Sequence, residues 1–286
     1  MSETFHFTGL SRGLAAVGAG LFFALAASAA GTNQVVDLME TNVPSADPTL
    51  AGGQSLNQAA SDPTASLMAV QVADWYNANL RDLPGEDANT VVLRTVIPFQ
   101  FDGYKNIFRA TIPFITDNPA VDSGLSDMTL FDLVVFNQSW GRWGVGPVAL
   151  LPTGGTSRGA DQWALGPAEG FTARQGKLLW GVFNQNLFTY TGAEDRNPVN
   201  VSVLQPIINY GLGHGWSVGG SEMTFSYDYY AGRWSSLPLG AALNKLVRFG
   251  KLPVQFSVQY EHDFADQRGT PEDTIRFSLK FLFPTH

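Results

Sequence analysis

The sequence predicts an all-β fold: a transmembrane antiparallel β-barrel of about 12 strands, preceded by a short flexible N-terminal segment. Three observations predict it. Apolar and polar residues alternate over many long segments, and the connections between these segments alternate between long and short. The composition also fits, because only 15% of the residues are charged and 30 are glycine, whereas soluble domains have about 25% charged residues.

Residues 1–30, the first element, have the features of a secretory signal peptide. Arg12 supplies a positive charge, residues 13–27 form an apolar core, and residues 27–29 form a small-residue cleavage pattern. A transmembrane anchor is the less favoured alternative, because the apolar run is short for a hydrocarbon core of about 30 Å. The chain has no cysteine, which suits export to the outer membrane of a Gram-negative bacterium, where a stray thiol would be oxidised.

Residues 31–62, the second element, are polar and lack periodicity, so we expect a flexible periplasmic lead-in. Within it, residues 62–65 suit a short helical turn, with Asp62 as N-cap and Pro63 at the first helical position. The barrel is expected to occupy residues 63–286. No stretch after the signal peptide reaches about 18 consecutive apolar residues, which excludes a helical membrane protein.

Period-two alternation marks the strands. Near the C-terminus, Ile275, Phe277 and Leu279 share one face, and Arg276 and Ser278 share the other. A helix would scatter these residues around its circumference, whereas a strand separates them into two faces. Most of the predicted strands reach the length of about 9–11 residues that a tilted membrane strand needs. Twelve strands are predicted, at residues 65–79, 89–101, 105–116, 127–140, 142–152, 161–172, 177–190, 198–211, 215–230, 233–248, 252–262 and 273–284.

The connections predict the topology. Long loops follow the odd-numbered strands and tight turns follow the even-numbered ones, except at residues 231–232. This asymmetry is typical of outer-membrane barrels, and an even strand number places both chain ends at the periplasmic, tight-turn end. Acidic residues concentrate in the long loops. A soluble two-sheet sandwich is the alternative; it explains the alternation but neither the loop lengths nor the isolated charges inside long strands.

Five prolines lie inside predicted strands. Proline cannot donate a hydrogen bond to a β-ladder and usually marks an edge or a bulge. We therefore predict β-bulges that bend the strands at these positions. The prolines are Pro98, Pro113, Pro147, Pro206 and Pro238.

Charged residues inside the strands are the candidate functional residues. A Lys or Arg facing the middle of the bilayer costs about 2–4 kcal/mol, so charges are expected to face the lumen. There they either pair with one another and fill the lumen or line a path; we favour a mainly structural network with selectivity as a secondary role. Small barrels of eight strands are filled by side chains and those of 16–18 are open, and 12 lies between. The lumen-lining candidates are Arg94, Arg109, Asp132, Asp228, Glu261, Arg276 and Lys280.

No enzyme, metal site or cofactor is expected. Residues 155–159 match the G-x-S-x-G pattern around Ser157, but a nucleophile elbow needs a strand, a turn and a following helix, and a loop is expected here. His262 is the one plausible base for a barrel hydrolase. Asp228, Glu261 and Asp263 do not have the spacing of a calcium-binding loop. The formal net charge of −8 argues against nucleic acid as a partner.

Several motifs carry a resemblance to a known family. They are WGVGPVALLPT at 143–153, QWALGPA at 162–168, NVSVLQPIINY at 200–210, LPLG at 237–240 and FLFP at 281–284. In order and spacing they resemble the bacterial outer-membrane family known as neuromedin U-like or transporter proteins, related to the outer-membrane proteins of meta-pathway phenol degradation. The resemblance covers roughly residues 62–284. It implies a barrel that passes small hydrophobic or aromatic molecules. The ending departs from the pattern, because residues 284–286 follow the last aromatic residue.

We therefore expect a bacterial outer-membrane barrel for the passive passage of small molecules, with hydrophobic or aromatic compounds as candidates. The expected partners are outer-membrane lipid, the barrel insertion machinery and an unidentified small solute. The alternative function is a structural or surface-interaction barrel without transport, whose acidic loops bind a partner. A barrel hydrolase is the third and least favoured possibility.

Overall fold

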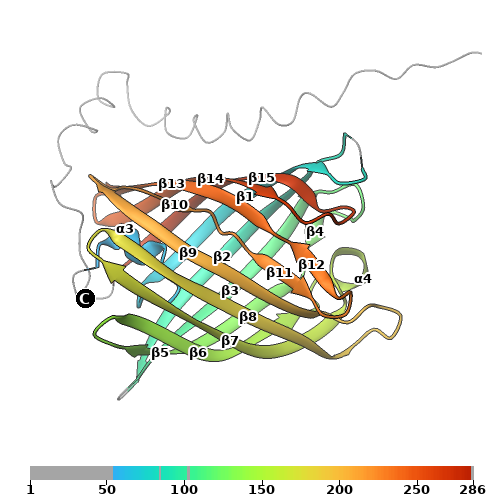
Figure 1. Cartoon of the computed structure of the whole chain (residues 1–286), viewed down its shortest axis with the longest axis horizontal. Coiled ribbons are helices and arrows are strands. Elements are labelled where there is room, and N and C mark those ends of the chain that lie inside the picture. Colours follow the sequence, from blue (N-terminus) through green and yellow to red (C-terminus); the bar gives the residue numbers. More distant parts are fainter. Residues whose placement is uncertain (1–53, 84, 102–103, 285–286) are drawn as a thin grey trace, which may run out of the picture. The chain divides into compact units, whose positions relative to one another are not determined.

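The computed structural model describes residues 54–83, 85–101 and 104–284. The predicted signal peptide (residues 1–30) and residues 31–53 of the lead-in lie outside the described residues. The described residues form two short helices and one antiparallel sheet (Figure 1). The elements are α3 (Leu56–Ala60), β1 (Met68–Leu80), β2 (Ala88–Phe101), β3 (Tyr104–Asp117), β4 (Gly124–Leu125), β5 (Met128–Asn137), β6 (Gly141–Leu151), α4 (Gly155–Arg158), β7 (Gln162–Gln175), β8 (Leu178–Gly192), β9 (Asn200–Gly213), β10 (Trp216–Gly220), β11 (Phe225–Asp228), β12 (Arg233–Ser236), β13 (Pro238–Phe249), β14 (Leu252–Asp263) and β15 (Pro271–Phe283).

The sheet closes on itself as a barrel of 12 strands, which confirms the predicted fold class and strand number. Neighbours pair in chain order, and β1 pairs with both β2 and β15. Two of the 12 strands are interrupted, because β10 and β11 together form the ninth and β12 and β13 form the tenth. Strand β4 only adds a short pairing to β3.

The two ends of the barrel differ as predicted. Connections of two or three residues join β2 to β3, β5 to β6, β7 to β8, β9 to β10 and β13 to β14. Longer connections lie at the other end, and the short turn between β11 and β12 is the exception that the sequence predicts. Met68 pairs with Phe283, so the described chain enters and leaves the barrel at the tight-turn end.

The wall separates two kinds of surface. Side chains alternate between faces along a strand, and one face carries a fully buried cluster that includes Leu133, Val148 and Phe183. The opposite face carries exposed aromatic and aliphatic side chains such as Trp163 and Leu165. An apolar exterior and an interior that is apolar over part of its surface leave few positions for charged residues, which is consistent with the low charged fraction of the sequence.

The prediction of a flexible lead-in was wrong for residues 54–62. Ser55 caps α3, since its Oγ accepts a hydrogen bond from the Gln58 backbone nitrogen at 3.2 Å, and all five residues of α3 are buried. The predicted helical turn at 62–65 is instead a tight turn, in which Asp62 Oδ1 accepts from the Thr64 nitrogen at 2.9 Å. The helix begins six residues before the predicted turn, at Leu56, because the barrel interior supplies partners that the local sequence does not reveal.

Polar contacts fix α3 and the turn after it to the barrel wall. Asn57 Oδ1 accepts from Gln255 Nε2 at 2.5 Å, and Gln58 Nε2 donates to the Lys177 carbonyl at 2.9 Å. Leu56 packs in an apolar cluster with wall residues such as Leu246 and Leu282. Residues 54–67, which we call the N-terminal plug, therefore contact strands on several sides of the lumen at the tight-turn end (Figure 1).

The prediction that prolines mark bulges was wrong for Pro98 and Pro147. Pro98 pairs in register with Ile107, and Pro147 pairs in register with Pro167. On one side of Pro113 and of Pro206, in contrast, the pairing changes register by one residue. Around Pro147, pairing between β5 and β6 skips residues 132–133 and 146–147, yet the register is the same on both sides. The missing N–H removes a hydrogen bond but does not require an extra residue.

Candidate functional site: a charged lumen

A break in the ninth strand brings a carboxylate into the lumen. Pairing with β9 stops at Gly219 and resumes at Phe225, and residues 221–224 between them form no strand. Glu222 lies in this break and lines a cavity inside the barrel. Its backbone nitrogen donates to Gln259 Oε1 on β14 at 3.0 Å. This hydrogen bond fixes the segment between β10 and β11 to a side chain of β14.

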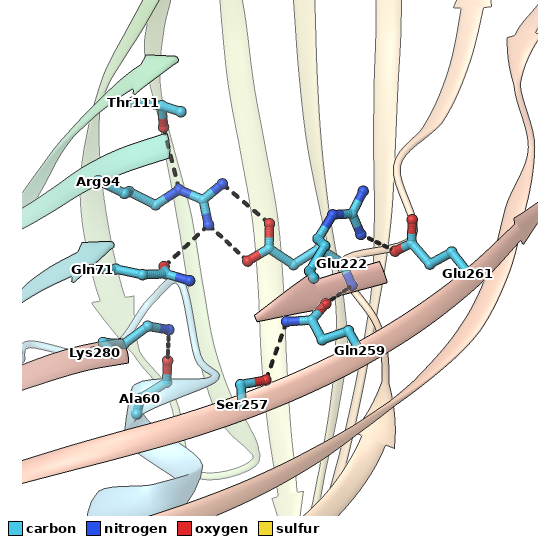
Figure 2. A network of polar contacts seen from close by, with 10 residues as sticks. Ala60, Gln71, Arg94, Thr111, Glu222, Ser257, Gln259, Glu261 and Lys280 are labelled. Carbon is cyan, nitrogen blue, oxygen red and sulfur yellow. Dashed lines mark hydrogen bonds and ion pairs between the residues drawn. The ribbon is translucent and has the colours of Figure 1, made fainter. Parts of the chain in front are cut away.

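Glu222 forms a two-point ion pair with Arg94 (Figure 2). Arg94 Nη1 lies 2.8 Å from Glu222 Oε1, and Nη2 lies 3.1 Å from Oε2. Arg94 also donates to Thr111 Oγ1 and Gln71 Oε1, each at 3.4 Å. A planar guanidinium that donates two parallel hydrogen bonds to a carboxylate makes one of the stronger polar contacts in proteins. The pair joins β2 to the interrupted strand across the lumen.

A second ion pair lies beside the first. Arg276 on β15 pairs with Glu261 on β14, and their side chains are 10% and 3% exposed. The Arg276 guanidinium carbon also lies 4.8 Å from the centre of the Trp75 ring. This pair holds neighbouring strands together from the inside, as the structural interpretation of the lumen charges predicts.

Arg109 and Lys280 complete the charged group. Arg109 on β3 stacks over Phe131, with its guanidinium carbon 4.2 Å from the ring centre. Lys280 on β15 donates to the Ala60 carbonyl at the end of α3 at 2.6 Å (Figure 2). Both residues line the same cavity as Arg94 and Glu222. The structure thus places five of the seven candidates inside the barrel: Arg94, Arg109, Glu261, Arg276 and Lys280.

The other two candidates lie elsewhere. Asp132 alternates with the buried Phe131 and Leu133, so it points outward, and it accepts a hydrogen bond from Asn106 Nδ2 at 2.8 Å. Asp228 caps the turn after β11, because its Oδ1 accepts from the Tyr230 nitrogen at 2.8 Å. Asp132 is an exception to the rule that charges avoid the outer face, and the Asn106 amide satisfies only one of its two carboxylate oxygens.

Sequence reasoning missed Glu222. It has the parity of Thr224 and Ser226, which the alternation places on the polar face, so extending that pattern by one residue would have found it. Gln71, Gln255 and Gln259 line the lumen cavity too. They were not distinguishable from surface glutamines, because only the closed wall shows which side of each strand is enclosed.

The residues considered for catalysis lie in ordinary surroundings. Ser157 lies in α4, a single helical turn, and not in the loop that the sequence predicts. His262 Nδ1 lies 3.0 Å from Asp273 Oδ1. No group of three or more potential metal ligands occurs among the residues that the structure describes. Within the described ranges, no helix is long and apolar enough to cross a membrane.

Solved structures similar to this chain are bacterial outer-membrane barrels. An outer-membrane channel from Pseudomonas putida F1 is 15% identical, with 76% of this chain and 94% of that chain covered and a TM-score of 0.52. The fold is that of a bacterial outer-membrane β-barrel. The KdgM porin is 10% identical, covering 76% and 99% of the two chains with a TM-score of 0.45. Outer membrane phospholipase A from Escherichia coli is 12% identical, covering 76% and 92% with a TM-score of 0.42.

No protein-family model matches the sequence, and no curated protein matches it. The solved structures are all too distant in sequence to carry more than the fold. The motif resemblance to the neuromedin U-like family therefore rests on the motifs alone.

Proposed function

We propose that this barrel lets small molecules diffuse passively across the bacterial outer membrane, and that its lumen selects among them by width and charge. One observation carries the proposal: the wall and the N-terminal plug bound a cavity of about 130 Å³, and its lining combines the charged Arg94, Glu222 and Lys280 with apolar side chains such as Ile107 and Phe131.

Passage in this proposal requires the N-terminal plug to move. The plug fills the tight-turn end of the lumen and is held by side-chain hydrogen bonds such as those of Asn57 and Lys280. Such contacts can exchange for water, because a neutral hydrogen bond contributes only about 0.5–1.5 kcal/mol net and one from a charged group such as Lys280 or Arg142 about 1.5–3 kcal/mol. When the plug is displaced, the polar side chains of the wall that it contacted are hydrated by water that enters the lumen. The motif resemblance supports hydrophobic or aromatic solutes, and the apolar part of the lining is compatible with them.

Recordings in planar bilayers, combined with solute uptake into liposomes, test the proposal. The purified full chain is expected to produce discrete conductance steps and to admit a small aromatic tracer into liposomes. A heat-modifiable band on a detergent gel establishes that the barrel is folded in the same sample. A folded barrel with neither conductance nor uptake contradicts the proposal and favours a structural or surface-interaction role.

A further inference from the structure

The lumen cavity holds more positive than negative charge. Three cations line it, namely Arg94, Arg109 and Lys280, together with two carboxylates, Asp62 and Glu222. Glu222 is engaged by Arg94, and Asp62 is engaged by Arg142. Among the described residues, Arg109 and Lys280 form no ion pair with a carboxylate, and they share only the more distant charge of Glu222, which Arg94 already engages.

Arg109 is the less satisfied of the two. Its Nε is enclosed and has no hydrogen-bond partner among the described residues. Its guanidinium lies flat against Phe131 at 4.2 Å and approaches the Phe183 ring at 5.6 Å. Ring stacking leaves the edge of the guanidinium, where the N–H groups are, free to donate. A polar group enclosed without a partner in a folded protein commonly indicates an absent water or ligand.

The rest of the cavity favours a particular kind of ligand. Val96, Ile107 and Ile207 present an apolar lining near Arg109, while Gln71 and Ser257 lie on the polar side. The cavity volume of about 130 Å³ is large enough for a carboxylate with a compact apolar body. Arginine matches the planar geometry of a carboxylate with two parallel hydrogen bonds.

We propose that this cavity binds a small organic monoanion, a carboxylate with a compact aromatic or aliphatic body. Arg109 donates to the carboxylate, Lys280 adds positive charge beside it, and the apolar lining contacts the body. The inference rests on the proposed function and deepens it, because it names the class of solute that the lumen retains and selects.

Titration calorimetry on the full chain in detergent tests the site, with benzoate as the probe and benzamide as its neutral isostere. Benzoate is expected to bind saturably and at least about tenfold more tightly than benzamide, because charge-assisted hydrogen bonds are lost with the neutral compound. The Arg109→Gln variant is expected to lose the same factor. Arg248→Gln, the same change at an exposed strand end, is the control and is expected to bind as the wild type does.

Two results would overturn the proposal. One is equal binding of benzoate and benzamide by the wild-type chain, which needs no variant to fold. The other is unchanged benzoate binding by a folded Arg109→Gln barrel. The outcome is separate from that of the proposed function: conductance without benzoate preference refutes the anion site alone, and benzoate binding by a barrel that does not conduct refutes passage alone.

Discussion

Glu222 and Arg94 form the pair on which the interior of the barrel depends most clearly. Their side chains are 19% and 14% exposed, so the charges are largely removed from solvent. Glu222→Gln leaves the guanidinium with a weaker partner and is expected to lower the free energy of unfolding by about 1–3 kcal/mol. Urea unfolding in lipid vesicles measures this. Glu272→Gln provides the control, because Glu272 pairs with Arg81 at 3.5 Å and is 44% exposed, and a loss below about 1 kcal/mol is expected there. If both variants lower the free energy of unfolding equally, the ion pair of Glu222 with Arg94 does not stabilise the barrel more than a surface pair does.

Asp132 offers a test on the outer face. Its Oδ1 is enclosed without a hydrogen-bond partner among the described residues, and its Oδ2 depends on Asn106. Replacing a buried ion by an apolar residue of similar volume is often neutral or stabilising, whereas removing its partner is destabilising. Asp132→Leu is therefore expected to maintain or raise the free energy of unfolding in lipid, and Asn106→Leu to lower it. If Asp132→Leu is the more destabilising of the two, the outward orientation of Asp132 is wrong.

At the scale of elements, the break in the ninth strand depends on a glycine of the next one. A Cβ on Gly240 would lie 2.0 Å from the Tyr260 carbonyl oxygen and 2.6 Å from Ser221 Oγ. Gly240→Val is therefore expected to displace residues 221–224 and to separate Glu222 from Arg94. We expect Gly240→Val to lower the free energy of unfolding by about 1–3 kcal/mol. Because the ion pair is then already separated, Glu222→Gln is expected to lower the free energy of unfolding less in the Gly240→Val background than in the wild type.

Gly220 provides the matched control for this cycle. A Cβ there meets only the Met223 side chain, with Cε at 2.5 Å and Sδ at 3.9 Å, and the flexible end of that side chain can move aside. Gly220→Val is expected to leave the cost of Glu222→Gln unchanged. Full additivity of Gly240→Val with Glu222→Gln would show that Gly240 does not position the break.

The elements also show why prediction from sequence succeeded and where it stopped. The alternation that predicts β14 and β15 is local, so strand number and loop asymmetry could be inferred residue by residue. Helix α3 could not be predicted, because its partners Gln255 and Lys280 lie about 200 residues further along the chain. The break at 221–224 depends in the same way on Gly240 and Gln259. The hydrogen bond that Asp132 receives on the outer face comes from Asn106, a neighbour in the sheet and not in sequence.

At the scale of the whole molecule, the barrel combines a hydrogen-bonded wall with a short segment inside it, the N-terminal plug. The wall is continuous around its 12 strands, whereas the N-terminal plug contacts it mainly through side chains. The plug lines the lumen cavity through residues 59–63. In the proposed function, displacement of this one short segment opens a path through the lumen without unfolding the sheet.

Tethering the plug to the wall tests this account most directly. The chain has no cysteine, so Asn57→Cys and Gln255→Cys, which replace two side chains in hydrogen-bond contact, can be joined by a short reducible cross-linker. In planar bilayers the cross-linked barrel is expected to show only the baseline current, and reduction is expected to restore discrete conductance steps. Each single-cysteine variant, treated in the same way, conducts throughout. A cross-linked barrel that conducts as well as the reduced one would contradict the account.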